Sequence, residues 1–196
     1  MKKSFLSSLI AILIICSTTL AATFSDISGM WAESYITELS NLGVINGYPD
    51  GTYRPNDTLT YGEYIKLIVT ASLPESDFSM LENKVEHWAG QYLTILENYE
   101  IVEEGTITKD ILNQKISRIE VVRILGECDI KIRKNVQKGS LLDFVDISEI
   151  DDMEKTLLRH AVATGVINGD PDGKFRPNDE LKRSEVAKII YTYTKM

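Results

Sequence analysis

Residues 43–57 read GVINGYPDGTYRPND, and residues 165–179 read GVINGDPDGKFRPND. The two stretches differ at three positions, and one of these exchanges Tyr53 for Phe175, another aromatic residue. The segment upstream returns as well, as FSDIS at residues 24–28 and FVDIS at residues 144–148. Self-similarity of this length indicates a duplicated structural unit.

A weaker copy lies between these two. Trp31 and the alanine after it correspond to Trp88 and its alanine, and Glu63 corresponds to Glu120. The Pro-Asp-Gly turn is missing there, because residues 103–108 read EEGTIT. The sequence therefore predicts three copies, of which the middle one has a diverged loop.

Each copy reads as helix, loop and helix. Apolar residues recur at helical spacing over residues 32–42, and Gly43 follows as a C-terminal cap. The YPDG sequence is typical of a tight turn, and the RPN segment keeps the chain extended until a second helix begins at about Tyr61. One helix pair cannot bury its apolar stripe alone, so we expect an all-α fold in which three copies pack together.

The division of the chain follows from these copies. We expect a signal peptide at residues 1–22 and repeats at residues 23–73, 84–128 (divergent) and 143–196. Lys2 and Lys3, a short apolar run at residues 9–16 and small residues near position 22 are typical of a secretory signal. A retained amphipathic anchor is the alternative, although the run is short for a membrane span. Removal of this segment leaves Cys128 alone, which excludes an internal disulfide in an exported chain.

Charge and motif content narrow the class of function. The net charge of −8 disfavours nucleic-acid binding and means that an acidic ligand must be held by local groups. The two histidines, His87 and His160, belong to no catalytic or metal-binding motif. We therefore expect no enzyme, no cofactor and no metal.

The chain resembles the S-layer homology family over residues 24–193. The resemblance is carried by the aromatic-x-Asp opening, the Trp-Ala helix start, the GYPDG loop, the RPN segment and a TRAE-like signature at the second helix. It implies a pseudo-threefold, three-pronged helical domain. It also implies a secreted protein of the cell wall or S-layer that binds secondary cell wall polysaccharide, often through a pyruvylated amino sugar, in grooves between motifs. No membrane span is expected in the mature chain.

The TRAE-like signature points to binding residues. It reads SRIE at residues 117–120 and KRSE at residues 182–185, but TYGE at residues 60–63, with Tyr61 at the place of the arginine. The planar guanidinium of an arginine at a helix N-terminus can donate two hydrogen bonds to a carboxylate, and the free N–H groups of the first helical turn can add to this binding. Arg118 and Arg183 are thus candidate clamps for an acidic sugar, and at most two sites are expected to be competent.

Other candidates have a structural alternative. Glu120 and Glu185 are candidate ligand contacts, but Glu63 and Glu120 also complete capping boxes with Thr60 and Ser117. Trp31 and Trp88 can each stack on a sugar ring or lie at the edge of the core, and a methionine, Met153, takes their place in the third copy.

Two aspartates and one loop complete the set of candidates. Asp26 and Asp146 can accept sugar hydroxyls or cap the start of their motifs. The loop at residues 168–179, NGDPDGKFRPND, has the spacing of a calcium loop in part, but Pro177 and the lack of a terminal glutamate favour a tight turn.

A different function is left open by these residues. The alternative to wall binding is a surface-layer structural or protein-binding scaffold that has partly lost its ligand. The sequence leaves open the polymer, its pyruvylation, the number of active motifs, the partner and the oligomeric state.

Overall fold

The computed structural model describes residues 24–74, 83–137 and 144–196, so the predicted signal peptide lies outside the described residues. These residues form helices and no strand. In chain order the helices are α1 (Glu33–Asn41), α2 (Tyr61–Ser72), α3 (Gly90–Asn98), α4 (Lys109–Leu112), α5 (Arg118–Lys131), α6 (Asp152–Ala163) and α7 (Arg183–Thr194). The prediction of an all-α fold is confirmed.

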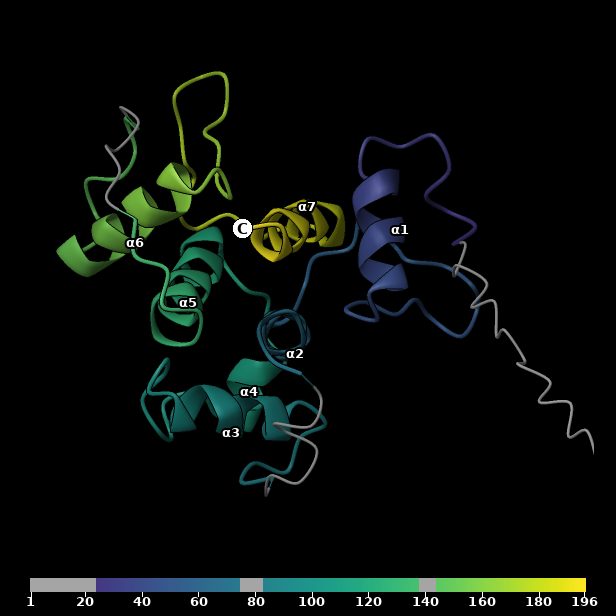
Figure 1. Cartoon of the computed structure of the whole chain (residues 1–196), viewed down its shortest axis with the longest axis horizontal. Helices are drawn as coiled ribbons and strands as arrows, with labels where there is room; N and C mark the ends of the chain where they lie inside the picture. Colours follow the sequence, from purple (N-terminus) through teal and green to yellow (C-terminus); the bar gives the residue numbers. More distant parts are fainter. Residues whose placement is uncertain (1–23, 75–82, 138–143) are drawn as a thin grey trace, which may run out of the picture.

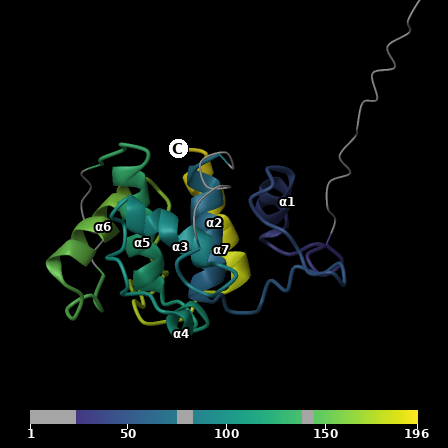
Figure 2. The same cartoon turned by 90° about the horizontal axis from the view of Figure 1, so that it is seen from below.

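The helices form an inner and an outer group (Figure 1). The second helices of the copies, α2, α5 and α7, lie in the middle, and α1, α3 and α6 lie outside them. Each first helix packs against the second helix of the preceding copy: α3 on α2, α6 on α5, and α1 on α7. The contact of α1 with α7 closes the ring and joins the two ends of the described chain, as the second view also shows (Figure 2).

Three short segments meet at the centre, where α2, α5 and α7 begin. Isolated β-bridges join these segments in a closed cycle, through the pairs Thr58–Lys182, Thr60–Lys115 and Ser117–Glu180. In each pair, the last residue of one segment faces the first residue of another, which gives the centre a pseudo-threefold arrangement.

The first N–H group of each inner helix donates a hydrogen bond at this centre. The bonds run from Tyr61 to the carbonyl of Gln114 (3.0 Å), from Arg118 to that of Asp179 (2.9 Å) and from Arg183 to that of Asp57 (2.8 Å). Inner helices of different copies are thus joined by backbone hydrogen bonds at equivalent places.

Buried polar groups supplement an apolar core. Tyr53 is 1% exposed, and its hydroxyl donates to the carbonyl of Arg183 (3.1 Å). Between α5 and α6, His160 Nε2 lies 2.7 Å from Asp129 Oδ2, and both side chains are buried. The N–H of Gln137 donates to His160 Nδ1 (3.1 Å), so Nε2 carries the proton and donates to Asp129.

The middle copy departs from the expected pattern. Its loop contains α4, a single turn of helix capped by Thr108, which the sequence analysis missed. Helix α5 continues to Lys131, three residues past the expected boundary at 128. The predicted capping box at Ser117 forms only in half: Ser117 accepts from the N–H of Glu120, whereas the Glu120 carboxylate binds Arg123. The box of Thr60 and Glu63 is complete.

Among the described residues, no helix combines the length and the apolar character that a bilayer span requires.

Candidate ligand-binding grooves

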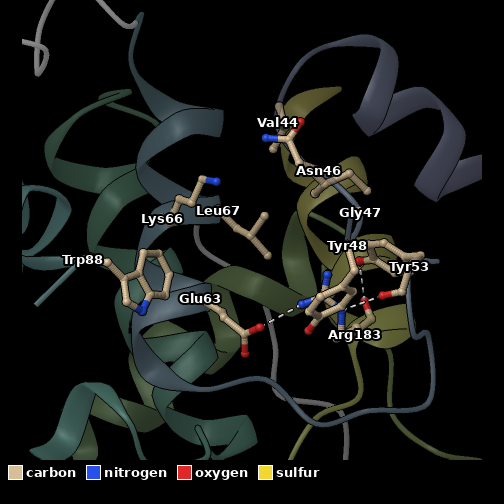
Figure 3. A pocket seen from close by; sticks show the side chains of 11 residues that line it. Val44, Asn46, Gly47, Tyr48, Tyr53, Glu63, Lys66, Leu67, Trp88 and Arg183 are labelled. Atoms are coloured by element: carbon tan, nitrogen blue, oxygen red, sulfur yellow. Dashed lines mark hydrogen bonds and ion pairs between the residues drawn. The ribbon is translucent and has the colours of Figure 1, made fainter. Parts of the chain in front are cut away.

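The first groove, called here the Arg183 groove, is a cavity of about 230 Å³ beside α2. Residues 44–48 and Tyr53 form its floor and one wall, and Glu63, Lys66 and Leu67 of α2 form another. Trp88 comes from the second copy and Arg183 from the third. Figure 3 shows Trp88, Lys66 and Glu63 facing Arg183, Tyr48 and Tyr53 across this space.

The second groove, called the Arg118 groove, is a cavity of about 210 Å³ beside α7. Its lining contains the equivalent stretch, residues 166–170, together with Glu185, Lys188 and Ile189 of α7. Trp31 comes from the first copy and Arg118 from the second. Each groove therefore combines the loop and inner helix of one copy with a tryptophan and an arginine from the two others.

The ring packing explains this convergence. Each first helix lies on the inner helix of the preceding copy, so its tryptophan reaches that copy's groove. The arginine lies in the groove because the start of its helix is hydrogen-bonded to the loop of another copy. The N–H of Arg183, for example, donates to the carbonyl of Asp57 (2.8 Å). Each groove is thus formed by the packing of all three copies and not by a single repeat.

Arg183 is firmly held in its groove. The residue is 8% exposed; its Nε donates to the carbonyl of Tyr53 (2.9 Å), and its Nη1 donates to Glu63 Oε1 (3.0 Å). Its guanidinium carbon lies 4.6 Å and 5.1 Å from the ring centroids of Tyr53 and Tyr48. Burial raises the pKa of the Tyr53 hydroxyl to about 12, although the positive charge of Arg183 opposes that shift.

Arg118 is held less firmly. Its Nη2 donates to the carbonyl of Asn168 (3.2 Å), and its guanidinium lies 5.4 Å from the Phe175 ring. Its Nε is buried and has no hydrogen-bond partner among the described residues. A buried donor of this kind is costly, so a ligand or water oxygen that met it would be favoured.

The equivalent place in the middle copy lacks both recognition residues. Tyr61 stands at the place of the arginine and Met153 at the place of the tryptophan. Arg123, which corresponds to Lys66, donates through Nε to Glu120 Oε2 (3.0 Å). Burial raises the pKa of Tyr61 to about 12, and the negative charge of Glu120 adds to that shift. Glu120 thus lies apart from both grooves, beside Tyr61 and Arg123.

The two tryptophans are exposed rather than core residues. Trp31 is 58% exposed and Trp88 is 56% exposed, and Met153 is 57% exposed at the corresponding place. An indole that remains open in a groove can stack on a flat apolar ligand face.

The starts of α5 and α7 do not offer free backbone N–H groups. The first-turn N–H groups were expected to be free for an anion, but those of Arg118 and Arg183 bind carbonyls of other copies. The next N–H in each helix is also taken, since Ile119 donates to Pro177 and Ser184 to Pro55. An anion in these grooves would therefore have to be held by side chains.

Asp26 and Asp146 lie outside both grooves. Asp26 accepts from the N–H groups of Tyr53 (2.8 Å) and Arg54 (2.7 Å). Asp146 accepts equivalent bonds from Phe175 and Arg176, both at 2.8 Å. Both arginines have a positive φ, 58° and 56°, which is unfavourable for a residue with a Cβ, so these carboxylates hold a strained loop.

The partial calcium loop is already neutralised by a cation. The Nη1 of Arg176 donates to Asp170, and its Nη2 donates to Asp172 (2.6 Å). In the described part of the chain, no cluster of three or more potential metal ligands occurs.

Lys66 and Lys188 are groove residues that the sequence analysis did not select. They lie at equivalent places, three residues after Glu63 and Glu185, and each lines its groove. The alignment of the three copies could have identified them, because each copy has a lysine or an arginine at this position.

The comparisons with known proteins agree with this architecture. The sequence model of the S-layer homology domain matches residues 23–65 and 143–187. The surface-layer 125 kDa protein of Lysinibacillus sphaericus is 27% identical over 185 residues, which are 92% of this chain and 15% of that protein. The S-layer protein EA1 of Bacillus anthracis is 25% identical over 172 residues, 86% of this chain and 20% of that protein.

An enzyme is also among the relatives. The exoglucanase XynX of Acetivibrio thermocellus is 26% identical over 178 residues, 87% of this chain and 16% of that protein. The chain therefore spans about a fifth or less of these three relatives. What they share with it is a segment of each, and the matched domain is an anchoring module rather than a catalytic one.

The fold, the grooves and these matches define a cell-surface attachment module. Residues 23–65 and 143–187 are matched as S-layer homology domains, and the chain is a secreted protein of the cell surface or cell wall.

Proposed function

We propose that the chain attaches non-covalently to secondary cell wall polysaccharide, through an acidic, pyruvylated amino sugar that enters the grooves between copies. The observation that carries this proposal occurs twice in the chain. In each of the two cavities, an exposed tryptophan, an arginine and a lysine come from three different copies and line the same space. The indole offers a stacking face for a sugar ring, and the two cations offer partners for a carboxylate.

The local charges matter because the chain as a whole is acidic. A net charge of −8 repels an acidic polymer at long range, but salt screens that field beyond about 8 Å. Lys66 and Lys188 line the cavities themselves, within which screening is weaker. An acidic sugar is therefore recognised only after it has entered a groove.

Co-sedimentation with purified wall sacculi tests this function. We expect the chain from residue 23 onward to pellet with intact sacculi and to stay in solution after the polysaccharide has been extracted. The double variant Trp31→Ala/Trp88→Ala should lose at least about tenfold in affinity, because both stacking faces are removed.

Met153→Ala is the matched control, since Met153 has the exposure of the two tryptophans but stands at the equivalent place of the middle copy, where Tyr61 replaces the arginine. It should pellet like the wild type. Equal pelleting before and after extraction, or none at all, would contradict the proposal. It would instead favour a surface-layer scaffold that binds another protein.

A further inference from the structure

The two grooves present their arginines in different electrostatic states. In the Arg183 groove, the guanidinium is paired with Glu63 at 3.0 Å. In the Arg118 groove, no carboxylate of the described residues lies within ion-pair distance of Arg118, which binds only the carbonyl of Asn168. One groove therefore contains a neutralised arginine and the other an arginine whose charge is uncompensated at close range.

Helix capping does not account for this difference. Glu63 and Glu185 are both the third residue of their helices, and both accept the N–H of the capping residue at 2.8 Å, from Thr60 and Lys182 respectively. Only Glu63 also binds an arginine through its second oxygen. The same residue type at the same place thus has an additional role in the Arg183 groove.

The walls of the grooves differ in the same sense. Tyr48 of the Arg183 groove is an aromatic ring that lies 5.1 Å from the Arg183 guanidinium carbon. Its counterpart in the Arg118 groove is Asp170, whose charge is bound by Arg176. The Arg183 groove is therefore the more aromatic of the two, and its arginine is already satisfied.

We propose that Glu63 divides the grooves by ligand charge: the Arg118 groove binds the acidic sugar, and the Arg183 groove binds an uncharged sugar of the same polymer. This inference rests on the proposed function. A ligand carboxylate in the Arg183 groove has to displace Glu63 and then remain beside its negative charge. In the Arg118 groove, a carboxylate gains a charge-assisted hydrogen bond without displacing one.

The chain contains its own reporters for this test. It has two tryptophans, and each lines one groove: Trp31 the Arg118 groove and Trp88 the Arg183 groove. Their indole N–H signals, assigned by Trp31→Phe and Trp88→Phe, follow the two sites separately in an NMR titration. The probes are the methyl glycoside of an N-acetylated amino sugar bearing a pyruvate ketal, and its parent without the ketal.

We expect the acidic probe to shift the Trp31 signal at concentrations at least about tenfold lower than those that shift the Trp88 signal. The neutral parent should bind at Trp88 at least as tightly as at Trp31. Equal affinity of the acidic probe for both grooves would overturn the inference and leave wall binding intact.

Glu63→Gln and its matched control Glu185→Gln identify the cause. A glutamine retains the capping interaction but cannot neutralise an arginine. Glu63→Gln should tighten acidic-probe binding at Trp88 about tenfold, whereas Glu185→Gln should change binding at Trp31 by much less. Equal gains in both variants would contradict the role of the Glu63–Arg183 pair. If neither indole signal moves and the wild type also fails to pellet with sacculi, the proposed function itself is wrong.

Discussion

Arg183 Nη1 donates to Glu63 Oε1 across 3.0 Å and so joins the inner helix of the third copy to that of the first. The pair is mostly shielded from solvent, with side-chain exposures of 10% for Arg183 and 27% for Glu63. Nε of the same guanidinium binds the carbonyl of Tyr53, where the first loop returns to the ring centre. Arg183 is thus a structural link as well as a groove residue.

The contrast between the two arginines gives a stability prediction. Arg183→Ala should lower the free energy of unfolding by about 2–4 kcal/mol, because it leaves a shielded carboxylate and a buried carbonyl without their partner. Arg118→Ala should cost about 1 kcal/mol or less, because it removes a single bond to Asn168. Urea titrations followed by circular dichroism measure both, and equal losses would contradict the difference in anchoring.

The repeat pattern predicted the helices well but not how they pack. Glycine caps and turn residues located the ends of the helices, since these signals act within a few residues. The packing of α1 on α7 joins residues far apart in the sequence, and no local pattern encodes it. The sequence therefore identified Arg118 and Trp31 separately, without indicating that they line one groove.

The same limit explains the incorrect expectation about helix N-termini. A TRAE-like signature shows that a helix begins, but not that the N–H of Arg118 is taken by Asp179 of another copy. Likewise, the partnership of Arg183 with Glu63 depends on the closed ring. Lys66 and Lys188 were detectable from their recurrence in the alignment of the copies, and only their position in the grooves distinguishes them from solvated lysines.

The loop aspartates are expected to act on stability and not on binding. Asp26→Ala and Asp146→Ala should each lower the free energy of unfolding by about 1–2 kcal/mol, because each leaves two loop N–H groups without an acceptor. Sacculus binding by the folded fraction should be unchanged. A variant that keeps wild-type stability but no longer pellets would show instead that its aspartate contacts the sugar.

Gly47 and Gly169 offer a matched pair for the close packing of the loop. A Cβ on Gly169 would lie 2.4 Å from the Phe144 ring, and one on Gly47 would lie 2.2 Å from the Phe24 ring and 2.7 Å from the Thr52 carbonyl oxygen. Gly169→Ala should cost about 1–3 kcal/mol and be partly rescued by Phe144→Leu, because a side chain can be made smaller.

Gly47→Ala should cost more than Gly169→Ala, and Phe24→Leu should rescue it less, because the backbone oxygen of Thr52 remains in place. Thermal unfolding of the four single and two double variants gives the comparison. Equal rescue in both loops would show that the backbone around Thr52 moves freely.

Alkaline pH should destabilise the fold through Tyr53. Burial raises the pKa of this phenol from its ordinary value of 10.0 to about 12 in the folded chain. Between these values the unfolded chain releases the proton and the folded chain keeps it, so stability falls as pH rises. The loss attributable to Tyr53 should start near pH 10 and reach about 2–3 kcal/mol by pH 12. Burial also raises the pKa of Tyr61, Tyr64 and Tyr193, so the informative quantity is the difference between wild type and Tyr53→Phe. Phenylalanine occupies the equivalent place at Phe175, and the variant should therefore fold.

At pH 8 Tyr53→Phe should be the less stable of the two by about 1 kcal/mol, since it lacks the hydrogen bond to the Arg183 carbonyl. Above pH 11 the order should reverse, and parallel stability curves from pH 8 to pH 12 would show that Tyr53 is not shielded as its contacts indicate.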